Sequence, residues 1–182
     1  MNAGMKVEVH VLTFFGRYTE LSNTFERKWF ANVPDSAIAI GERSSSYMFG
    51  GSSVAKKIAS EGAEIAFTYQ GEALKKRVSP LAESIGSSII IPCDVTDTAS
   101  MQATFKILKE KWQNIDFLVH GIGFSNKDEL RGKYYNTTSE NFNQTMHISC
   151  FSFTEACKLA EPIMNEGGSL LTLTYYGSEQ VM

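Results

Sequence analysis

Four apolar stretches of this sequence end in residue types that contact nucleotides. Gln70 ends the first, Asp94 lies near the end of the second, Gly121 and Gly123 end the third, and Tyr175 lies near the end of the fourth. The stretches cover residues 63–70, 88–97, 116–124 and 169–177. In an open parallel sheet, ligands bind in the crevice outside the carboxyl ends of the strands. Polar residues and glycines repeated at four such ends therefore predict a nucleotide-binding cleft.

Helical periodicity occupies the segments between these stretches. Apolar residues recur there at i, i+4, i+7 and i+11, which places each series on one face of a helix. The series are Leu74, Val78, Leu81 and Ile85; Met101, Phe105, Leu108 and Trp112; and a longer one from Phe142 to Met164. Strands that alternate with helices and are apolar on both faces predict an α/β fold. We expect a Rossmann-like, doubly wound parallel sheet that is incomplete, with its last strands and helices missing.

The expected helix ends carry residues suited to capping. Glycines that favour left-handed C-caps follow the helical segments, and side chains that accept N-cap hydrogen bonds precede them. The glycines are Gly62, Gly86 and the pair Gly167-Gly168; the N-cap candidates are Asp97 or Thr98 and Thr138 or Ser139. Pro80 interrupts the first periodic series, so a kink or a short first turn is expected there.

Composition narrows the class of protein. The chain has 182 residues, the length of one ordinary domain, and a net charge of −3 from 17 basic and 20 acidic residues. The charges are well mixed, which argues against a nucleic-acid partner. No apolar run approaches the roughly 20 residues of a membrane span, and no continuous apolar segment of a secretion signal is present. Three cysteines without metal-ligand spacing indicate reduced core thiols and no metal site. We expect a cytoplasmic protein.

The first 50 residues give the weakest pattern. Residues 6–13 could be a strand by alternation, but residues 36–41 look more like the first strand of a dinucleotide-binding unit. Glycines follow at Gly41, Gly50 and Gly51, without the G-x-G-x-x-G spacing of a phosphate loop. A divergent phosphate loop and a plain polar turn both remain open. We therefore divide the chain into an atypical segment, 1–35, and an incomplete dinucleotide-binding domain, 36–182.

Several segments resemble the enoyl-acyl-carrier-protein reductases of bacterial fatty-acid synthesis, a divergent branch of the short-chain dehydrogenases/reductases. They read AEIAFTYQGEALKKRVSPLAESIG, CDVTD, KEKWQNIDFLVHGIGFSNKDELRGKY, ENFNQTMHISCFSFTEA and GGSLLTLTYYGSEQVM. The resemblance covers about residues 54–182. It implies NADH-dependent reduction of the trans-2 double bond of an enoyl thioester held on acyl carrier protein. The N-terminal third departs from the family, whose opening glycine loop has a counterpart here only at Gly41.

The resemblance assigns cofactor roles to individual residues. Gln70 matches a glutamine on the adenosine side of the cofactor, and Glu72 close by disfavours a 2′-phosphate, so NADH is expected rather than NADPH. Asp94 and Val95 match the pair that brackets the adenine, although Asp94 could also cap the following helix. The adenosine ribose is expected to lie against Ile122 and Gly123.

Substrate and catalytic roles follow from the same resemblance. Ser125 matches a position whose backbone meets the acyl substrate, and Tyr175 matches the first active-site tyrosine, although Tyr176 could exchange roles with it. His120 lies inside an apolar strand and is better interpreted as a hydrogen-bonded core residue than as an acid or base. Lys127 and its basic neighbours could meet the carrier protein, but a solvated loop is the simpler interpretation.

The family's second tyrosine and its lysine follow in a P-x-Y-N-x-M-G-x-x-K-like stretch that does not occur after Tyr175 here. We therefore expect no enoyl turnover from this polypeptide. A non-catalytic NAD-binding remnant and a fragment without function remain alternatives. The resemblance implies a homotetramer for the full-length family and leaves the oligomeric state of this chain open. Residues 169–176 are expected to form an unpartnered sheet edge.

Overall fold

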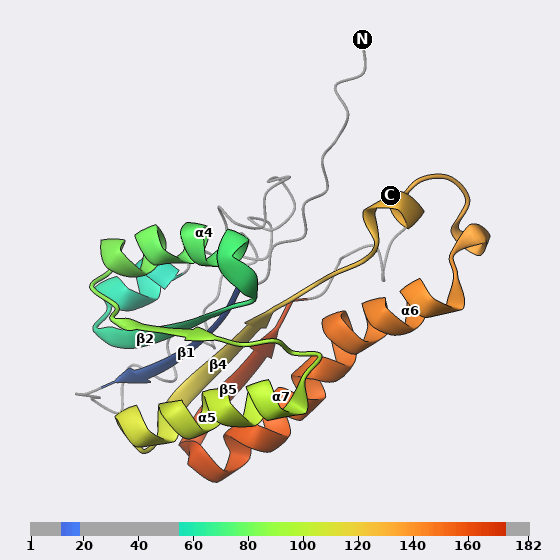
Figure 1. The fold of residues 1–182 in the computed structure, drawn as a ribbon. Coiled ribbons are helices and arrows are strands. Elements are labelled where there is room, and N and C mark those ends of the chain that lie inside the picture. Colours follow the sequence, from blue (N-terminus) through green and yellow to red (C-terminus); the bar gives the residue numbers. More distant parts are fainter. Residues whose placement is uncertain (1–11, 19–54, 174–182) are drawn as a thin grey trace, which may run out of the picture.

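A computed structural model describes residues 12–18, as backbone, and residues 55–173 (Figure 1). Four of its strands are those that the apolar stretches predict: β2 (Ala63–Tyr69), β3 (Ile89–Pro92), β4 (Ile115–Gly121) and β5 (Met164–Thr172). Together with β1 (Leu12–Tyr18) they form a five-stranded sheet in the order β3-β2-β1-β4-β5, in which β2 and β3 are parallel and β4 and β5 are parallel. The α/β class is confirmed.

The central strand differs from the prediction. β1 (Leu12–Tyr18) lies between β2 and β4 and runs antiparallel to both, with Phe14 opposite Phe67 on one side and Val119 on the other. The pattern assigned this central place to a parallel strand at residues 36–41, which lie outside the described residues. An antiparallel ladder satisfies the backbone groups of the neighbouring strands as fully as a parallel one does. Hydrophobic alternation carries no information on strand direction.

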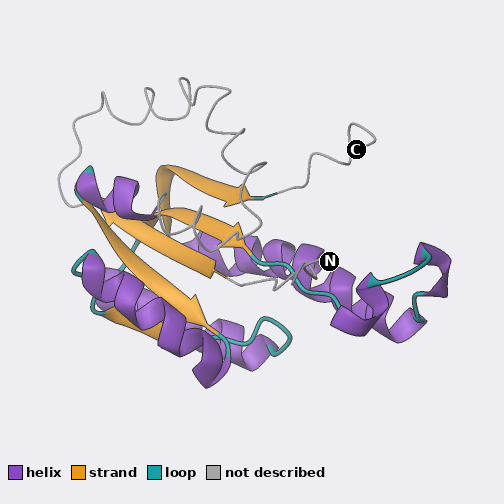
Figure 2. Cartoon of the chain, turned by 90° about the horizontal axis from the view of Figure 1, so that it is seen from above, coloured by secondary structure: helices purple, strands orange, loops and turns teal. Residues whose placement is uncertain are grey.

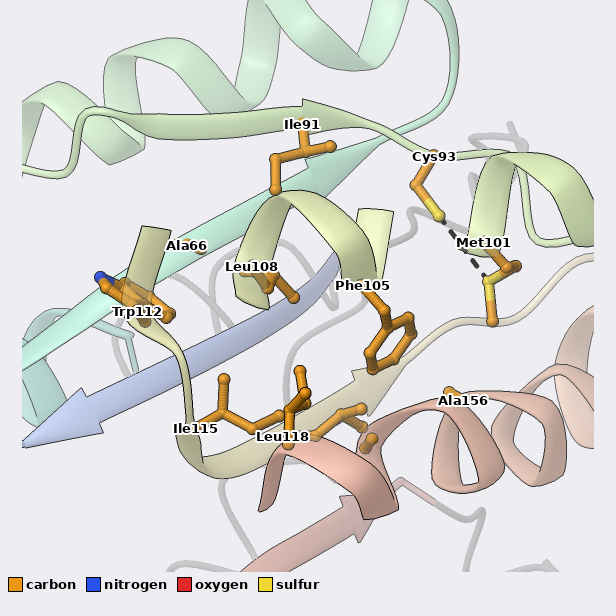
Figure 3. Close-up of a cluster of buried hydrophobic side chains, with 12 residues drawn as sticks. Ala66, Ile91, Cys93, Met101, Phe105, Leu108, Trp112, Ile115, Leu118 and Ala156 are labelled. Atoms are coloured by element: carbon orange, nitrogen blue, oxygen red, sulfur yellow. Dashed lines mark hydrogen bonds between the residues drawn. The ribbon is translucent and has the colours of Figure 1, made fainter. Parts of the chain in front are cut away.

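Helices cover both faces of the sheet, as doubly wound topology requires (Figure 2). Residues 55–60 are helical and, with α4 (Gly71–Ser84), pack on one face through a core that includes Phe67, Val78 and Val119. On the other face lies α5 (Thr98–Trp112), together with α7 (Ser152–Ala160). Here Phe105, Leu108 and Leu118 belong to a second core, drawn in Figure 3.

Capping agrees with the sequence at most ends. The Asp97 side chain accepts a hydrogen bond from Ala99 N at the start of α5, and Thr138 accepts one from Asn141 N at the start of α6 (Ser139–Met146). Gly62 and Gly86 end the first two helices with φ of 95° and 73°. Pro80 lies inside α4, which continues through it without interruption. The short 3-10 turns are η1 (Lys127–Leu130), η2 (Tyr134–Asn136) and η4 (Glu161–Ile163).

The long helix expected from Phe142 to Met164 is divided. A π-helical turn, η3 (His147–Phe151), separates α6 from α7, and the chain enters β5 at Met164. An apolar series at helical spacing is compatible with one wide turn, so the pattern does not reveal it. Cys150 lies on this turn and is exposed, contrary to the expected core position; Cys93 is buried.

Gly167 and Gly168 lie within β5 and do not cap a helix. They belong to an irregularity where Met164 pairs with Ile115 and Ser169 with Phe117. Gly167 has φ of 83°, and a Cβ on Gly168 would overlap the Met164 sulfur. The two glycines therefore let extra residues bulge out of the strand.

β5 is the edge of the sheet within the part that the structure describes, as predicted. Leu170 and Leu171 are 41% and 43% exposed although their side chains point to opposite faces of the strand. Among the described helices, none has the length and apolarity of a membrane-spanning segment.

Because Phe15 of β1 pairs with Ala66 on one side and Leu118 on the other, a proline at this position removes a ladder hydrogen bond. We expect Phe15→Pro to lower the free energy of unfolding by about 1–3 kcal/mol, the cost of an unsatisfied buried backbone group. Thr98→Pro is the matched control, since it places proline at the first position of α5, where proline is tolerated. Urea unfolding of the two variants measures the difference. Equal stabilities would contradict a central β1.

Candidate functional site

Gln70 and Asp94 meet at the carboxyl ends of β2 and β3. The Gln70 side-chain amide donates to Asp94 Oδ2 at 3.1 Å. Gln70 occupies the N-cap position of α4, but its side chain makes no capping bond there. Its amide is therefore directed across the strand ends toward Asp94. The two residues that were predicted to bind the adenosine end lie side by side.

Asp94 is held as an ionised acceptor. Its Oδ1 accepts from the Thr96 backbone N at 2.9 Å and from the Thr96 hydroxyl at 2.7 Å, which closes a local turn. Burial raises the pKa of Asp94, but the hydrogen bonds from Thr96 and Gln70 together leave that pKa below its ordinary value. Asp94 does not cap α5, because Asp97 does so. The carboxylate of Asp94 is therefore not used to cap a helix and can accept a hydrogen bond from a ligand at the edge of the sheet.

Val95 and Ile122 converge from two different strand ends. Both line a hollow of about 10 Å³, the space of a single water molecule, under the carboxyl edge of the sheet. Thr68 at the end of β2 and His120 near the end of β4 also line it. Val95 follows Asp94 directly in the sequence, so one wall of the hollow adjoins the backbone of Asp94. Gly123 follows Ile122 and is half-buried.

The loop after β4 is fastened to the start of α6. Asn126 N donates to Asn141 Oδ1 at 2.8 Å, and the Ser125 hydroxyl accepts from Asn141 at 3.3 Å and from Thr145 at 3.1 Å. Ser149 Oγ accepts from Phe124 N at 2.9 Å. The side chain of Ser125 therefore faces α6, and its backbone lies in a fixed loop.

The three residues on α6 and the π turn that hold this loop were not identified from the sequence. Asn141, Thr145 and Ser149 are spaced i, i+4 and i+8, so they form a polar row on one helix face. This row runs beside the apolar row of Phe142, Met146 and Cys150. A polar row at helical spacing next to an apolar one is the signal that could have found them.

His120 is a core residue, as expected. It is 1% exposed, and its Nε2 lies 2.7 Å from the Ser152 oxygen. The Ser152 hydroxyl donates to the Ile148 carbonyl, so its oxygen accepts from His120, which places the proton on Nε2. Burial lowers the pKa of His120 to about 4, so the ring is neutral at physiological pH. It has no free proton to exchange with a ligand.

Two predicted site residues, Gly41 and Tyr175, lie outside the described residues. Glu72 is in the first turn of α4, and its carboxylate lies 3.5 Å from Lys75 Nζ. Within the described residues, no group of three His, Cys, Asp or Glu is arranged to hold a metal ion. Lys127, Arg131 and Lys133 are all exposed.

Residues 51–182 match the family described as Enoyl-(Acyl carrier protein) reductase. The chain belongs to this family. It is 57% identical over 129 residues to the Enoyl-[acyl-carrier-protein] reductase [NADH] 2 of Rhizobium meliloti strain 1021, a match that covers 71% of this chain and 48% of the relative. The chain thus spans about half the length of the curated relatives it matches.

Solved structures agree with this family. The FabI structure from Candidatus Liberibacter asiaticus has a TM-score of 0.69 at 51% identity, covering 72% of this chain and 51% of that one. The reductase of Anaplasma phagocytophilum, solved in complex with NAD, has a TM-score of 0.69 at 49% identity, covering 76% and 53%. These likenesses confirm the Rossmann-like class.

The buried His120 gives the stability of this reductase-family chain a defined pH dependence. Its pKa is about 4 in the fold against 6.5 for the unperturbed side chain, so the unfolded state binds more protons below pH 6.5. Stability should fall as the pH drops from about 6.5 to about 4, by up to about 3 kcal/mol from this residue. Chemical unfolding at several pH values measures the slope.

The variants for this measurement are His120→Gln, which removes the titrating group, and His147→Gln, which replaces an exposed histidine. His120→Gln should flatten the slope between pH 6.5 and pH 4 more than the control His147→Gln does. An unaltered slope in His120→Gln would show that His120 is not held neutral in the fold.

Proposed function

We propose that the family function of this chain is NADH-dependent reduction of enoyl thioesters carried on acyl carrier protein, in the cytoplasm, and that its described residues contribute the adenosine side of the cofactor site. The proposal is supported by relatives named as NADH-dependent enoyl-[acyl-carrier-protein] reductases and by a neighbouring structure in complex with NAD. The observation that carries it is the hydrogen bond between Gln70 and Asp94 beside Val95 and Ile122.

The adenosine end of NADH fits this arrangement chemically. A carboxylate offers about four lone-pair directions, and the described donors to Asp94 use three of them. The remaining direction suits the exocyclic amine of adenine, which is a hydrogen-bond donor. Val95 and Ile122 supply apolar surface for the adenine ring and the ribose. Gln70, positioned by Asp94, faces the adenosine from the end of β2.

The residues that we assign to the reactive end of the site are inferred from membership of the family. When bound, NADH supplies a hydride to the β-carbon of the enoyl thioester. Ser125, with its side chain fixed to α6, presents its backbone to the acyl substrate, and Tyr175 matches the family's first active-site tyrosine. The exposed Glu72 favours NADH over NADPH, although Lys75 beside it and solvent weaken the repulsion of a 2′-phosphate.

Asp94→Asn tests the cofactor proposal while keeping the shape of the side chain. We expect saturable NADH binding by the unaltered chain and an affinity loss of about 10-fold in Asp94→Asn, because a hydrogen bond to a charged group is weakened. Glu83→Gln, on the exposed distal end of α4, removes one carboxylate and should bind as the unaltered chain does. NADH fluorescence titration measures all three. Equal affinities in all three would remove Asp94 from the site.

The reaction itself has a separate test. This polypeptide should reduce a crotonyl thioester with NADH no faster than buffer does. Of the family's catalytic residues, its sequence matches only the first tyrosine, at Tyr175, and not the second tyrosine or the lysine. Each missing donor to a developing oxyanion costs on the order of 10²–10³ in rate. Absorbance of NADH at its nicotinamide band follows the reaction. Turnover above the buffer rate would show that other residues supply the missing groups.

A non-catalytic nucleotide-binding protein is the second candidate. The reversed direction of β1 favours it, because Tyr18, the last residue of that strand, pairs with Ala63 at the start of β2, at the edge of the sheet opposite the adenosine residues.

A further inference from the structure

The main chain of Ser125 lies between two residues whose own main-chain groups are bonded within the fold. Phe124 N donates to Ser149 Oγ at 2.9 Å, and the same hydroxyl lies 3.2 Å from Phe124 O, to which it can donate. Asn126 N donates to Asn141 Oδ1, and Asn126 O accepts from a backbone N–H of η1. Among the described residues, none bonds to Ser125 N or to Ser125 O. This part of the loop therefore offers a ligand one N–H donor and one C=O acceptor, both on Ser125.

Asn141 is the residue of α6 that contacts both Ser125 and Asn126. Its side chain is buried, with 6% of its surface exposed. Because a backbone N–H can only donate, the Asn141 atom that lies 2.8 Å from Asn126 N must be the amide oxygen. The amide nitrogen is then directed toward the Ser125 hydroxyl, 3.3 Å away. One buried amide thus fixes Asn126 through its main chain and Ser125 through its side chain.

Asn141 is itself held by the cap of α6. Its backbone N donates to Thr138 Oγ1 at 3.2 Å. The backbone N and the hydroxyl of Thr138 donate in turn to the two carboxylate oxygens of Glu129, at 2.8 and 2.9 Å. The loop is therefore joined to the first turn of α6 at Asn126 and again at Glu129. Such a loop is ordered before a ligand arrives, which lowers the entropy cost of binding.

We infer that Asn141 is a positioning residue for the enoyl thioester. The inference rests on the proposed function, in which the Ser125 main chain meets the acyl substrate, and it names the residue that sets the conformation of that main chain. With its amide in place, the Ser125 N–H stays free to donate to a carbonyl oxygen of the substrate. Without that amide, Asn126 N loses its acceptor and Ser125 loses one of its two partners on α6.

The adenosine end of the site is supported independently of Asn141. Gln70 and Asp94 lie at the ends of β2 and β3, and Asp94 N donates to Ser100 Oγ on α5 at 2.9 Å. The printed bonds of the Asn141 side chain go to the loop after β4 alone. Loss of the Asn141 amide should therefore weaken thioester binding and spare NADH binding, a difference that a general loss of stability would not produce.

Nuclear magnetic resonance titration of the full 182-residue chain tests this inference. The probe is the N-acetylcysteamine thioester of crotonic acid, which carries no nucleotide that could occupy the adenosine site. It should shift the Ser125 amide signal saturably. Asn141→Leu keeps a similar shape without a hydrogen-bonding group. We expect it to weaken probe binding by at least about 10-fold and NADH binding by less than about three-fold, since a buried N–H is left without an acceptor.

Two further variants serve as controls. Asn143→Leu makes the same substitution at an exposed position of α6 and should bind both ligands as the unaltered chain does. Asn141→Asp keeps an oxygen acceptor for Asn126 N, and a carboxylate is favoured in the first turn of a helix. It should hold the probe within about three-fold of the unaltered chain. Amide hydrogen exchange at Asn126 should be faster in Asn141→Leu than in Asn141→Asp.

The contrary outcomes are distinct. Unchanged probe affinity in Asn141→Leu would overturn the inference, and so would an equal loss of probe and NADH affinity, which would indicate a general structural role. Absence of saturable probe binding by the unaltered chain would also overturn it. In that case NADH titration separates the two proposals: saturable NADH binding leaves the proposed cofactor site standing, whereas its absence overturns that site as well.

Discussion

The backbone pairing of β1 with both β2 and β4 is the constraint on which the rest of this structure depends. Both hydrophobic cores contain residues from β2 and from β4, so the two strands belong to one sheet even though they do not pair with each other. Their facing N–H and C=O groups need partners, since each unsatisfied buried group costs about 1–3 kcal/mol. β1 supplies partners to β2 from Phe14 to Tyr18 and to β4 from Leu12 to Gly16, and it joins the parallel pairs β2–β3 and β4–β5.

The carboxyl ends of β3 and β4, where the predicted site residues lie, are each held in place by packing or hydrogen bonds to helices. Met101 and Phe105 on α5 pack beneath the end of β3, where buried Cys93 immediately precedes Asp94. On the β4 side, Asn141 and Ser149 hold the following loop through its backbone. The functional residues are thus placed by strands and helices with buried faces. Such support explains how the half-buried carboxylate of Asp94 and the exposed amide of Gln70 keep a defined mutual geometry.

Much of this edge could be predicted from the sequence because its signals are local. A continuous apolar run followed by Gln70 or Asp94 specifies a buried strand and its end, and an oxygen at Asp97 or Thr138 specifies where the next helix begins. The apolar period of α5 identifies the residues of its core face, including Leu108 and Trp112. The convergence of Gln70 with Asp94 follows from these local signals and the parallel pairing of β2 with β3.

The remaining features depend on non-local or directionless information. Alternation in a strand is the same read in either direction, so it could not give the orientation of β1. The π turn does not interrupt the helical spacing of the apolar residues, so the sequence does not reveal it. A pair of glycines is compatible with a strand bulge as well as with a helix cap, and Gly167 was therefore misassigned. Residues such as Asn141, whose partner lies on a distant loop, need tertiary structure to be recognised.

Nuclear Overhauser contacts between backbone protons measure most directly whether β1 lies antiparallel between β2 and β4. An antiparallel β1 should give contacts of Phe15 with both Ala66 and Leu118, and of Leu12 with Gly121 at the carboxyl end of β4. Contacts that instead placed Leu12 beside the start of β4, or that paired β2 with a parallel strand on that side, would contradict it.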